Sequence, residues 1–356
     1  MDKEFLKQLL AVKTPSGHET NAKDVIYDNL KKSGIPFKYV FDDNAKNFCV
    51  SVGNRNNIHG AKRIMLSGHI DEIGLQVQHI DDKGFIHFIK DGGIDQKVLL
   101  GATVTILTAK GEVKGVIGKQ PIHIEWYGDN KDKVIPIKDM KIDVGAETKD
   151  EAIEMGISVG DYITIDDIPM DIGKNRFCGK GLDDKVGVFV AFEALKELAK
   201  HDLGIEVFAV ACTQEEVGAT GATIAAKKVN PDISIDYDVT FATDDEYVSP
   251  NEWGDIKLGK GGAIAYGPDS NKELSNFVKD TCKAQGIPFQ EFSVRSGGTD
   301  TVHIKKASAD AKTMLLSIPN RNMHTQVEVC DYRDIQSLID MTVQTILRIA
   351  KGEKID

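Results

Sequence analysis

Features that mark several other classes of protein are missing from this chain. Its five cysteines are scattered, none forms a C-x-x-C pair, and their number is odd, so we expect a reduced, cytoplasmic protein without a disulfide framework. No apolar run approaches the roughly 20 residues that span a bilayer, and the first residues carry no apolar signal-peptide region. The net charge is −11 and no lysine- or arginine-rich run is present, so we expect neither a nucleic-acid partner nor a membrane partner.

The chain has 356 residues, which is too long for one ordinary hydrophobic core and suits two domains, or one domain with an insert. From about residue 166, apolar strand-like runs alternate with helical periodicity, which predicts an α/β fold with a mixed, mostly parallel sheet and helices on both faces. Residues 73–118 instead show short β-prone runs separated by hairpin turns. We therefore predict an α/β domain formed by residues 1–71 and 166–356, with a small all-β domain inserted at 72–165.

Two adjacent carboxylates, Glu215 and Glu216, follow the apolar run at 205–211. Like charges at the end of a buried strand are costly unless positive charge lies beside them, and a metal ion fits this requirement. Successive side chains at a strand end point in opposite directions. One glutamate can therefore bind a metal ion while its neighbour holds a water or a proton.

Two histidines lie just beyond predicted strands. His69 and Asp71 follow the apolar strand at 63–67 and share a face in extended chain, which suits a metal-binding histidine whose ring is steadied by a carboxylate. His324 follows the strand predicted at 312–317. Taken singly, each histidine also fits a simpler interpretation, as a hydrogen-bonded structural residue or an exposed loop residue.

Further carboxylates occur at two other strand or helix ends. Asp183 and Asp184 precede a predicted amphipathic helix; Asp184 fits a helix cap, and Asp183 is the better candidate ligand. Asp236 and Asp238 alternate along the strand predicted at 235–242, which fits either the ligand-binding end of a parallel sheet or an exposed edge strand. Since the carboxyl ends of strands in an open α/β sheet meet at one crevice, we expect these groups to converge there. Histidine and carboxylate ligands without cysteine suit zinc or cobalt in a hydrolytic site.

Short motifs with this chemistry follow one another along almost the whole chain. With these motifs in this order, the chain resembles the tetrahedral (TET) aminopeptidases, cytosolic dinuclear metallopeptidases that include glutamyl aminopeptidases. The resemblance implies removal of the N-terminal residue from short peptides. The motifs are Thr14-Pro-Ser-Gly-His-Glu19, Gly68-His-Ile-Asp-Glu-Ile-Gly74, Ile117-Gly-Lys-Gln-Pro-Ile-His123, Asp143-Val-Gly-Ala146, Leu182-Asp-Asp-Lys-Val-Gly187, Gln214-Glu-Glu-Val-Gly218, Asp238-Val-Thr240, Gly297-Gly-Thr-Asp300 and Ile318-Pro-x-Arg-x-Met-His324.

The resemblance implies two divalent metal ions in each subunit, zinc or cobalt. Glu215 matches the general base that activates a metal-bridging water, and Asp71 matches the carboxylate that supports a metal-binding histidine. The resemblance also implies that the inserted domain is a β-barrel-like dimerisation domain and that dimers assemble into a hollow tetrahedral dodecamer. The implied metal ligands are Asp183, shared by both ions, His69 and Asp238 at one ion, and Glu216 and His324 at the other.

The substrate pocket is less well defined by the sequence. Lys260 and Arg295 are candidate basic groups in it, although both also fit solvated surface charges, and Gly297 and Gly298 form a loop that would let a substrate backbone approach closely. Basic groups favour acidic N-terminal residues, and an apolar pocket would favour aliphatic ones. We expect acidic residues to be preferred, with aliphatic residues next.

The chain departs from the family pattern at Thr220 and Lys185, where arginine is usual, and at Asn322, where an aromatic residue is frequent. None of these is an expected ligand, so the departures concern pocket shape and local ion pairs. The alternatives within hydrolases are a related dinuclear deacylase or carboxypeptidase. The alternative outside them is a non-catalytic, metal-stabilised scaffold, against which Glu215 argues because a structural site needs no base.

Overall fold

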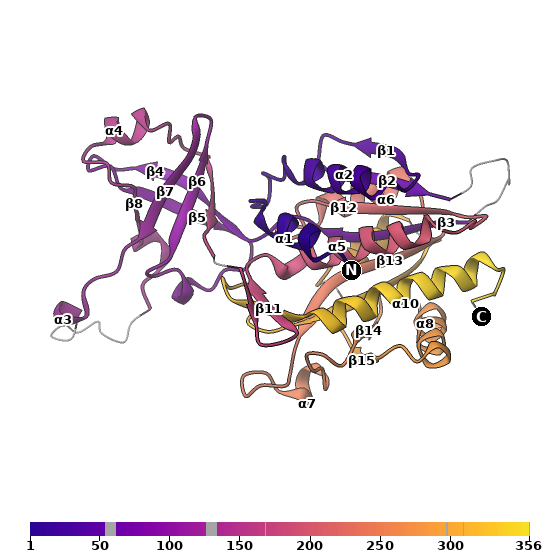
Figure 1. The fold of residues 1–356 in the computed structure, drawn as a ribbon. Helices are drawn as coiled ribbons and strands as arrows, with labels where there is room; N and C mark the ends of the chain where they lie inside the picture. The colour runs from indigo at the N-terminus through magenta and orange to yellow at the C-terminus, as the bar shows by residue number, and fades with distance from the viewer. Residues whose placement is uncertain (54–61, 126–133, 168, 297, 309, 356) are drawn as a thin grey trace.

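The computed structural model describes residues 1–53, 62–125, 134–167, 169–296, 298–308 and 310–355. It consists of an eight-stranded sheet flanked by helices and, to one side, a closed barrel (Figure 1). The chain leaves the large sheet after β3, builds the barrel, and then returns to the sheet. The predicted combination of an α/β sheet with an inserted all-β unit is confirmed.

The strands of the large sheet lie in the order β1-β2-β12-β3-β13-β16-β14-β15. The four strands β12, β3, β13 and β16 run parallel to one another, whereas β2 runs antiparallel to β1 and β12, and β14 runs antiparallel to β16 but parallel to β15. The mixed, mostly parallel sheet is therefore as predicted. Its strands are β1 (Lys38–Asp42), β2 (Phe48–Val52), β3 (Arg63–His69), β12 (Glu206–Cys212), β13 (Ile233–Phe241), β14 (Gly262–Tyr266), β15 (Phe289–Ser293) and β16 (Lys312–Asn320).

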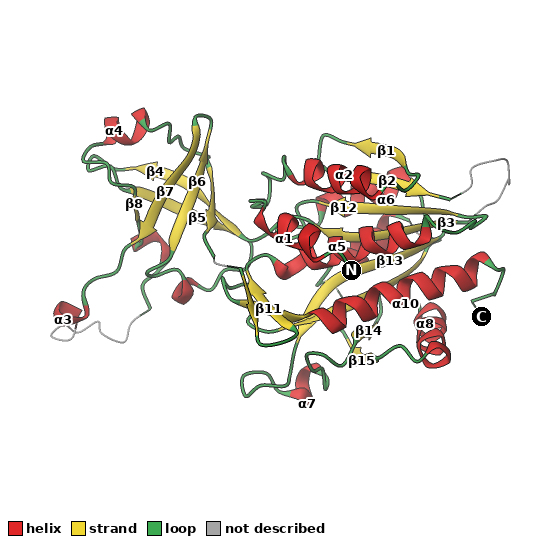
Figure 2. Ribbon diagram, viewed as in Figure 1, coloured by secondary structure: helices red, strands yellow, loops and turns green. Residues whose placement is uncertain are grey.

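Helices cover both faces of this sheet (Figure 2). Ile64 and Leu66 of β3 belong to the core under α5 and α10, whereas Met65 packs on the other face with α6 and α9. Because the central strands are buried on both faces, they are apolar almost throughout rather than alternating. The helices are α1 (Lys3–Ala11), α2 (Ala22–Ser33), α5 (Leu182–Leu198), α6 (Thr220–Val229), α8 (Lys272–Gln285), α9 (Asp300–Ala307) and α10 (Tyr332–Ala350).

The barrel has a hydrophobic core of its own, in which residues such as Leu75, Val104 and Ile163 are fully buried. Its strands follow the order β4-β5-β8-β7-β6-β9. The limits that we assign to this unit, residues 72 and 165, stay a prediction. The strands are β4 (Gly74–Ile80), β5 (Ile86–Asp91), β6 (Thr103–Thr108), β7 (Gly111–Ile117), β8 (Ile142–Asp143) and β9 (Tyr162–Ile165).

A buried ion-pair network connects the barrel to the large sheet at Glu72. Its carboxylate accepts hydrogen bonds from Lys180 at 2.5 Å and from Lys185 at 2.7 Å. The hydroxyl of Thr164, on barrel strand β9, donates to the same carboxylate at 3.1 Å. Glu72 and Lys185 are almost completely buried. One buried carboxylate thus holds the barrel, the start of α5 and the segment after β3 together.

The structure also contains short elements that the sequence did not predict. Strand β14 and helix α9 are among them, and a separate three-stranded sheet lies in the order β10-β11-β17. Within the described ranges, no helix is both long and apolar enough to cross a membrane. The remaining elements are β10 (Met170–Ile172), β11 (Arg176–Gly179), β17 (Glu328–Asp331), α3 (Ile122–Glu125), α4 (Lys149–Glu154), α7 (Pro250–Trp253) and the 3-10 turns η1 (Gln96–Val98) and η2 (Ile137–Asp139).

Candidate metal centre

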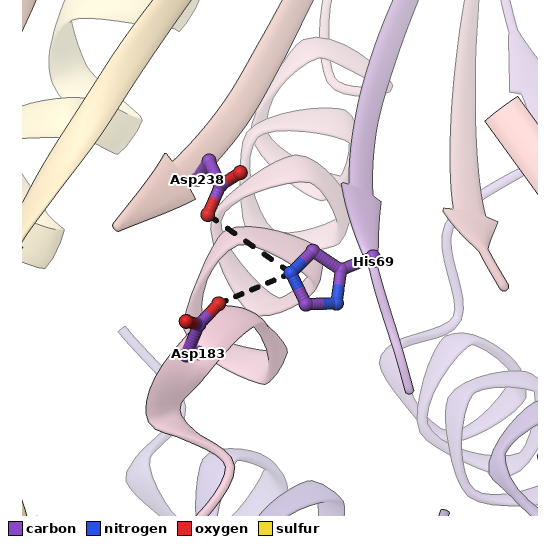
Figure 3. A group of neighbouring side chains, drawn as sticks. All are labelled: His69, Asp183 and Asp238. Carbon is purple, nitrogen blue, oxygen red and sulfur yellow. Dashed lines mark hydrogen bonds and ion pairs between the residues drawn. The ribbon is translucent and has the colours of Figure 1, made fainter. Parts of the chain in front are cut away.

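The carboxyl ends of β3 and β13 and the start of α5 bring three side chains together (Figure 3). His69 is the last residue of β3, and its Nε2 lies 3.1 Å from Oδ1 of Asp183. The same nitrogen lies 3.9 Å from Oδ1 of Asp238, on β13. One ligand atom from each residue lies within 4.8 Å of the others, so these side chains can hold a metal ion.

A second group of three side chains shares Asp183 with the first. Its other oxygen, Oδ2, lies 3.1 Å from Nε2 of His324, and Oε1 of Glu216 lies 3.4 Å from that same nitrogen. The atoms of this group also lie within 4.8 Å of one another. The structure therefore places the five side chains expected as metal ligands in two adjoining groups, with the two oxygens of Asp183 facing one group each.

Both histidines are held through their other ring nitrogen by a main-chain carbonyl. Nδ1 of His69 lies 3.1 Å from the carbonyl oxygen of Asp71, and Nδ1 of His324 lies 2.9 Å from that of Gly93. A carbonyl only accepts hydrogen bonds, so each Nδ1 must carry the proton. This leaves the Nε2 lone pair of each histidine free to bind a metal.

Replacing Gly93 with alanine is expected to weaken metal binding at the second group. A Cβ at Gly93 would lie 2.9 Å from Nδ1 of His324, so the ring would have to move from the position that directs Nε2 at Asp183 and Glu216. We expect about a 10- to 100-fold loss of metal affinity, the usual effect of disturbing such a support. Metal titration of the apoprotein measures it.

Gly118→Ala is the matched control, because a Cβ there meets nothing within 4 Å. Equal metal affinity of the Gly93→Ala and Gly118→Ala proteins would show that metal binding does not depend on the ring position that the glycine at 93 allows for His324.

Glu215 lies beside the first group, with Oε2 4.0 Å from Nε2 of His69. The carboxylate of Asp71 accepts the backbone N–H groups of Glu215 at 3.0 Å and Glu216 at 3.2 Å, and the hydroxyl of Ser16 at 2.6 Å. The same carboxylate is 3.5 Å from Nδ1 of His69. Asp71 thus supports the histidine chiefly with its carbonyl, while its side chain fixes the backbone of the two glutamates.

Two further acids, Asp184 and Asp236, are buried and hydrogen-bonded. Asp184 accepts the N–H of Gly187 at 3.1 Å, as expected for a helix cap, and also the N–H of His69 at 3.2 Å. Asp236 accepts hydrogen bonds at 2.8 Å from the hydroxyls of Ser67 and Thr301. Because β13 lies inside the sheet, the alternative of an exposed edge strand with solvated acids is wrong.

The two groups carry more negative than positive charge. Burial and the neighbouring Asp183 raise the pKa of Asp238 well above its usual range, and burial raises the pKa of Glu215 to about 7. Burial lowers the pKa of His324, but Asp183 and Glu216 outweigh burial and raise that pKa to about 11. Protons thus compensate for clustered carboxylates here. Divalent cations would displace those protons, so the residues present fit a metal centre.

The cavity beside the second group has one wall from the barrel side and one from the loop that carries His324. The described residues that line it include neither Lys260 nor Arg295, both of which are exposed. Strand β15 is parallel to β14, and β14 is antiparallel to β16. Arg295, which follows β15, therefore leaves the sheet at the end of the strands opposite to the metal groups. Gly298 is exposed, and Gly297 lies outside the described residues.

Sequence reasoning did not single out Gly93 or Glu328, although both contact the second group. Gly93 lies in a turn after β5, where glycine is common for many reasons. Glu328 is buried and accepts the backbone N–H groups of Asp183 and His324. Gly93 contributes its main-chain carbonyl, and Glu328 binds main-chain N–H groups of other residues. Main-chain groups are the same in every residue, so neither contact leaves a recognisable sequence motif.

A mostly parallel sheet whose strand ends present two histidine–carboxylate groups around one shared aspartate defines a metal-dependent hydrolase. Comparison with known proteins narrows this class. The M42 glutamyl aminopeptidase family model matches residues 50–341, and the chain belongs to this family. The protein is accordingly a metal-dependent aminopeptidase, a peptide hydrolase of the M42 type.

Individual relatives agree with this assignment over nearly the full length. The lysyl aminopeptidase of Pyrococcus furiosus is 32% identical over 353 residues, which cover 96% of this chain and 95% of the relative. The crystal structure of a TET aminopeptidase from a marine-sediment Thaumarchaeota archaeon has a TM-score of 0.90 at 30% identity and covers 98% of both chains. The TET1 peptidase of Pyrococcus horikoshii, which can assemble into a tetrahedron or a large octahedral shell, has a TM-score of 0.82 at 31% identity, covering 96% of this chain and 98% of that one.

Proposed function

We propose that this aminopeptidase works with two divalent ions, zinc or cobalt, that share Asp183. The observation that carries the proposal is the position of its two carboxylate oxygens, each 3.1 Å from Nε2 of a different histidine, His69 or His324. Each histidine has its own second acid, Asp238 or Glu216. Imidazole nitrogen and carboxylate oxygen are ligands that both metals accept.

Ions bound in these groups would supply Lewis acidity to the scissile carbonyl and lower the pKa of a water. Glu215 takes the proton of the attacking water and returns it to the leaving amine. Asp71 holds the backbone of Glu215 through a 3.0 Å hydrogen bond, so this carboxylate stays beside the first group. The second ion or a nearby acid would hold the free α-amine of the substrate, which would restrict cleavage to the first peptide bond.

Two observations bear on the preferred N-terminal residue and favour different answers. The family is described as glutamyl aminopeptidase, which supports acidic residues. The barrel side of the cavity is lined by Ile73, Val98 and Ile165, which supports aliphatic ones. Lys180 also lines the cavity, but its ammonium group is paired with Glu72 at 2.5 Å. The name of the Pyrococcus furiosus relative, lysyl aminopeptidase, adds basic residues to the set that must be compared.

We also propose that the protein forms a dodecamer built from dimers through the barrel. The proposal is supported by the tetrahedral assembly of the Pyrococcus horikoshii TET1 peptidase, which is similar to this chain along almost its whole length. Light scattering on the purified protein would then report twelve copies of the 39.0 kDa chain. A dimer or monomer that hydrolyses peptides normally would contradict the assembly without affecting the proposed chemistry.

Hydrolysis of a substrate panel tests the activity. We expect release of the N-terminal residue from free aminoacyl-p-nitroanilides and short peptides, loss of that release with a chelator, and its recovery with zinc or cobalt. Glutamyl, leucyl and lysyl substrates compared by kcat/KM settle the preference. Cleavage of N-acetylated substrates alone would favour a deacylase, cleavage from the carboxyl end a carboxypeptidase, and no cleavage with any metal a scaffold.

A further inference from the structure

Glu328 binds the backbone of the second metal group with both oxygens of its carboxylate. Oε1 accepts the N–H of His324 at 2.9 Å, and Oε2 accepts the N–H of Asp183 at 3.2 Å. The side chain is almost fully buried and lies on β17. Two expected ligands of one ion, which come from distant parts of the chain, are therefore joined by a third residue that is itself outside both ligand groups.

The hydrogen bond between Glu328 and the N–H of His324 also fixes the backbone conformation of His324. The φ angle of His324 is 62°, which is a left-handed backbone conformation that residues other than glycine seldom adopt. Such a conformation persists only where surrounding contacts enforce it. Here the N–H is held by Glu328 and the ring by the carbonyl of Gly93. Without Glu328 the loop would be free to relax, and the Nε2 atom would leave Asp183 and Glu216.

The hydrogen bond between Glu328 and the N–H of Asp183 fixes the backbone of the second ligand. Glu328 pairs with Gly179 across the β11–β17 ladder, shortly before the chain reaches Asp183. The same arrangement recurs at the first group, where the carboxylate of Asp71 accepts the N–H groups of Glu215 and Glu216. Carboxylate-to-backbone hydrogen bonds thus fix ligand-bearing segments in both groups.

We propose that Glu328 is a positioning residue for the ion held by Asp183, Glu216 and His324. This inference rests on the proposed two-ion function. Its effect should differ between the two ions, because Glu328 holds two expected ligands of the second ion, Asp183 and His324, but only the shared Asp183 of the first. Loss of Glu328 should therefore weaken the second ion much more than the first. A role through negative charge alone would instead weaken both ions together.

The test is titration of the metal-free protein with cobalt(II), followed by visible absorption and by metal analysis after dialysis. Wild type is expected to bind two equivalents. In Glu328→Ala the affinity for one equivalent should fall by about 10- to 100-fold, while the affinity for the other equivalent should fall much less. Val327→Ala, at a neighbouring side chain that is 54% exposed, is the matched control and should bind both equivalents normally.

Glu328→Gln keeps the shape of the side chain and one acceptor oxygen, so it decides the question if Glu328→Ala does not fold. An intermediate, equally selective loss is expected there. Unchanged binding in both variants, or an equal loss of both equivalents, would overturn the positioning role and leave the two-ion function standing. Binding of fewer than two equivalents by wild type would overturn both.

Discussion

Replacing Glu215 with glutamine will lower kcat by about 10²- to 10⁴-fold, the usual contribution of a general base, and will leave the metal ions bound. Glutamine keeps the size of the side chain but cannot accept the proton of the attacking water. Glu215 belongs to neither group of candidate ligands, so its loss should not release metal. The measurement is kcat on the best substrate together with metal content after dialysis.

Glu216→Gln is the matched contrast, since the neighbouring carboxylate lies 3.4 Å from Nε2 of His324 within the second group. Its activity should fall because metal is lost, and excess zinc or cobalt should restore part of it. The Glu215→Gln protein should not respond to added metal. If Glu215→Gln kept most of its activity, or regained it with metal, Glu215 would not be the base.

Replacing Glu72 with glutamine is expected to lower the free energy of unfolding by about 3–5 kcal/mol, the usual cost of removing one member of a buried ion pair. Lys185, which is fully buried, and Lys180, whose side chain is 12% exposed, would then lie beside a neutral amide. Chemical denaturation at neutral pH measures the change. Glu197→Gln is the control: it removes a pair with Lys200 whose side chains are more than half exposed, and such pairs contribute about 0–1 kcal/mol.

The same network predicts a pH dependence. Burial opposes the negative charge of Glu72, but Lys180 and Lys185 outweigh burial and lower its pKa to about 2 from an ordinary value of 4.5. A carboxyl with a lowered pKa in the folded state stabilises the protein above pH 4.5, and this stabilisation is lost as the pH falls from 4.5 through 2. In Glu72→Gln that part of the acid sensitivity should be absent. An unfolding free energy within 1 kcal/mol of wild type, with unchanged acid sensitivity, would contradict the role of Glu72.

The parts of the site that the sequence could predict are those where local pattern and chemistry coincide. His69 ends a buried apolar strand and Glu215 follows another, and polar groups at these places must face either solvent or a ligand. The structure brings them together with Asp183, Asp238 and His324, because parallel strands end at one edge of a sheet. Which residue binds which ion came from the resemblance, and those roles stay predictions.

The parts that the sequence could not predict depend on contacts between distant segments. Val327, Glu328 and Val329 alternate in polarity, and this pattern suggests that the glutamate faces solvent. The structure has the reverse: Glu328 is 2% exposed and Val327 is 54% exposed. The carboxylate is satisfied by the backbone N–H groups of His324, in the preceding loop, and of Asp183, which is 145 residues away in the sequence. A local polarity pattern contains no sign of the second contact. Strand β14 was not predicted for a simpler reason: its five residues form a short apolar run, which is compatible with a strand, a buried helix segment or a loop.

The strand order has a consequence for the newly synthesised chain. Strand β12 lies between β2 and β3, so the large sheet cannot be assembled until residues 206–212 have been made. The barrel uses consecutive strands that end at Ile165, and domains generally fold in order of synthesis. His324 follows almost at the end of the chain. A nascent or prematurely terminated polypeptide therefore has a complete barrel long before it has a complete set of metal ligands, and a peptide-cleaving centre cannot form on an unfinished molecule.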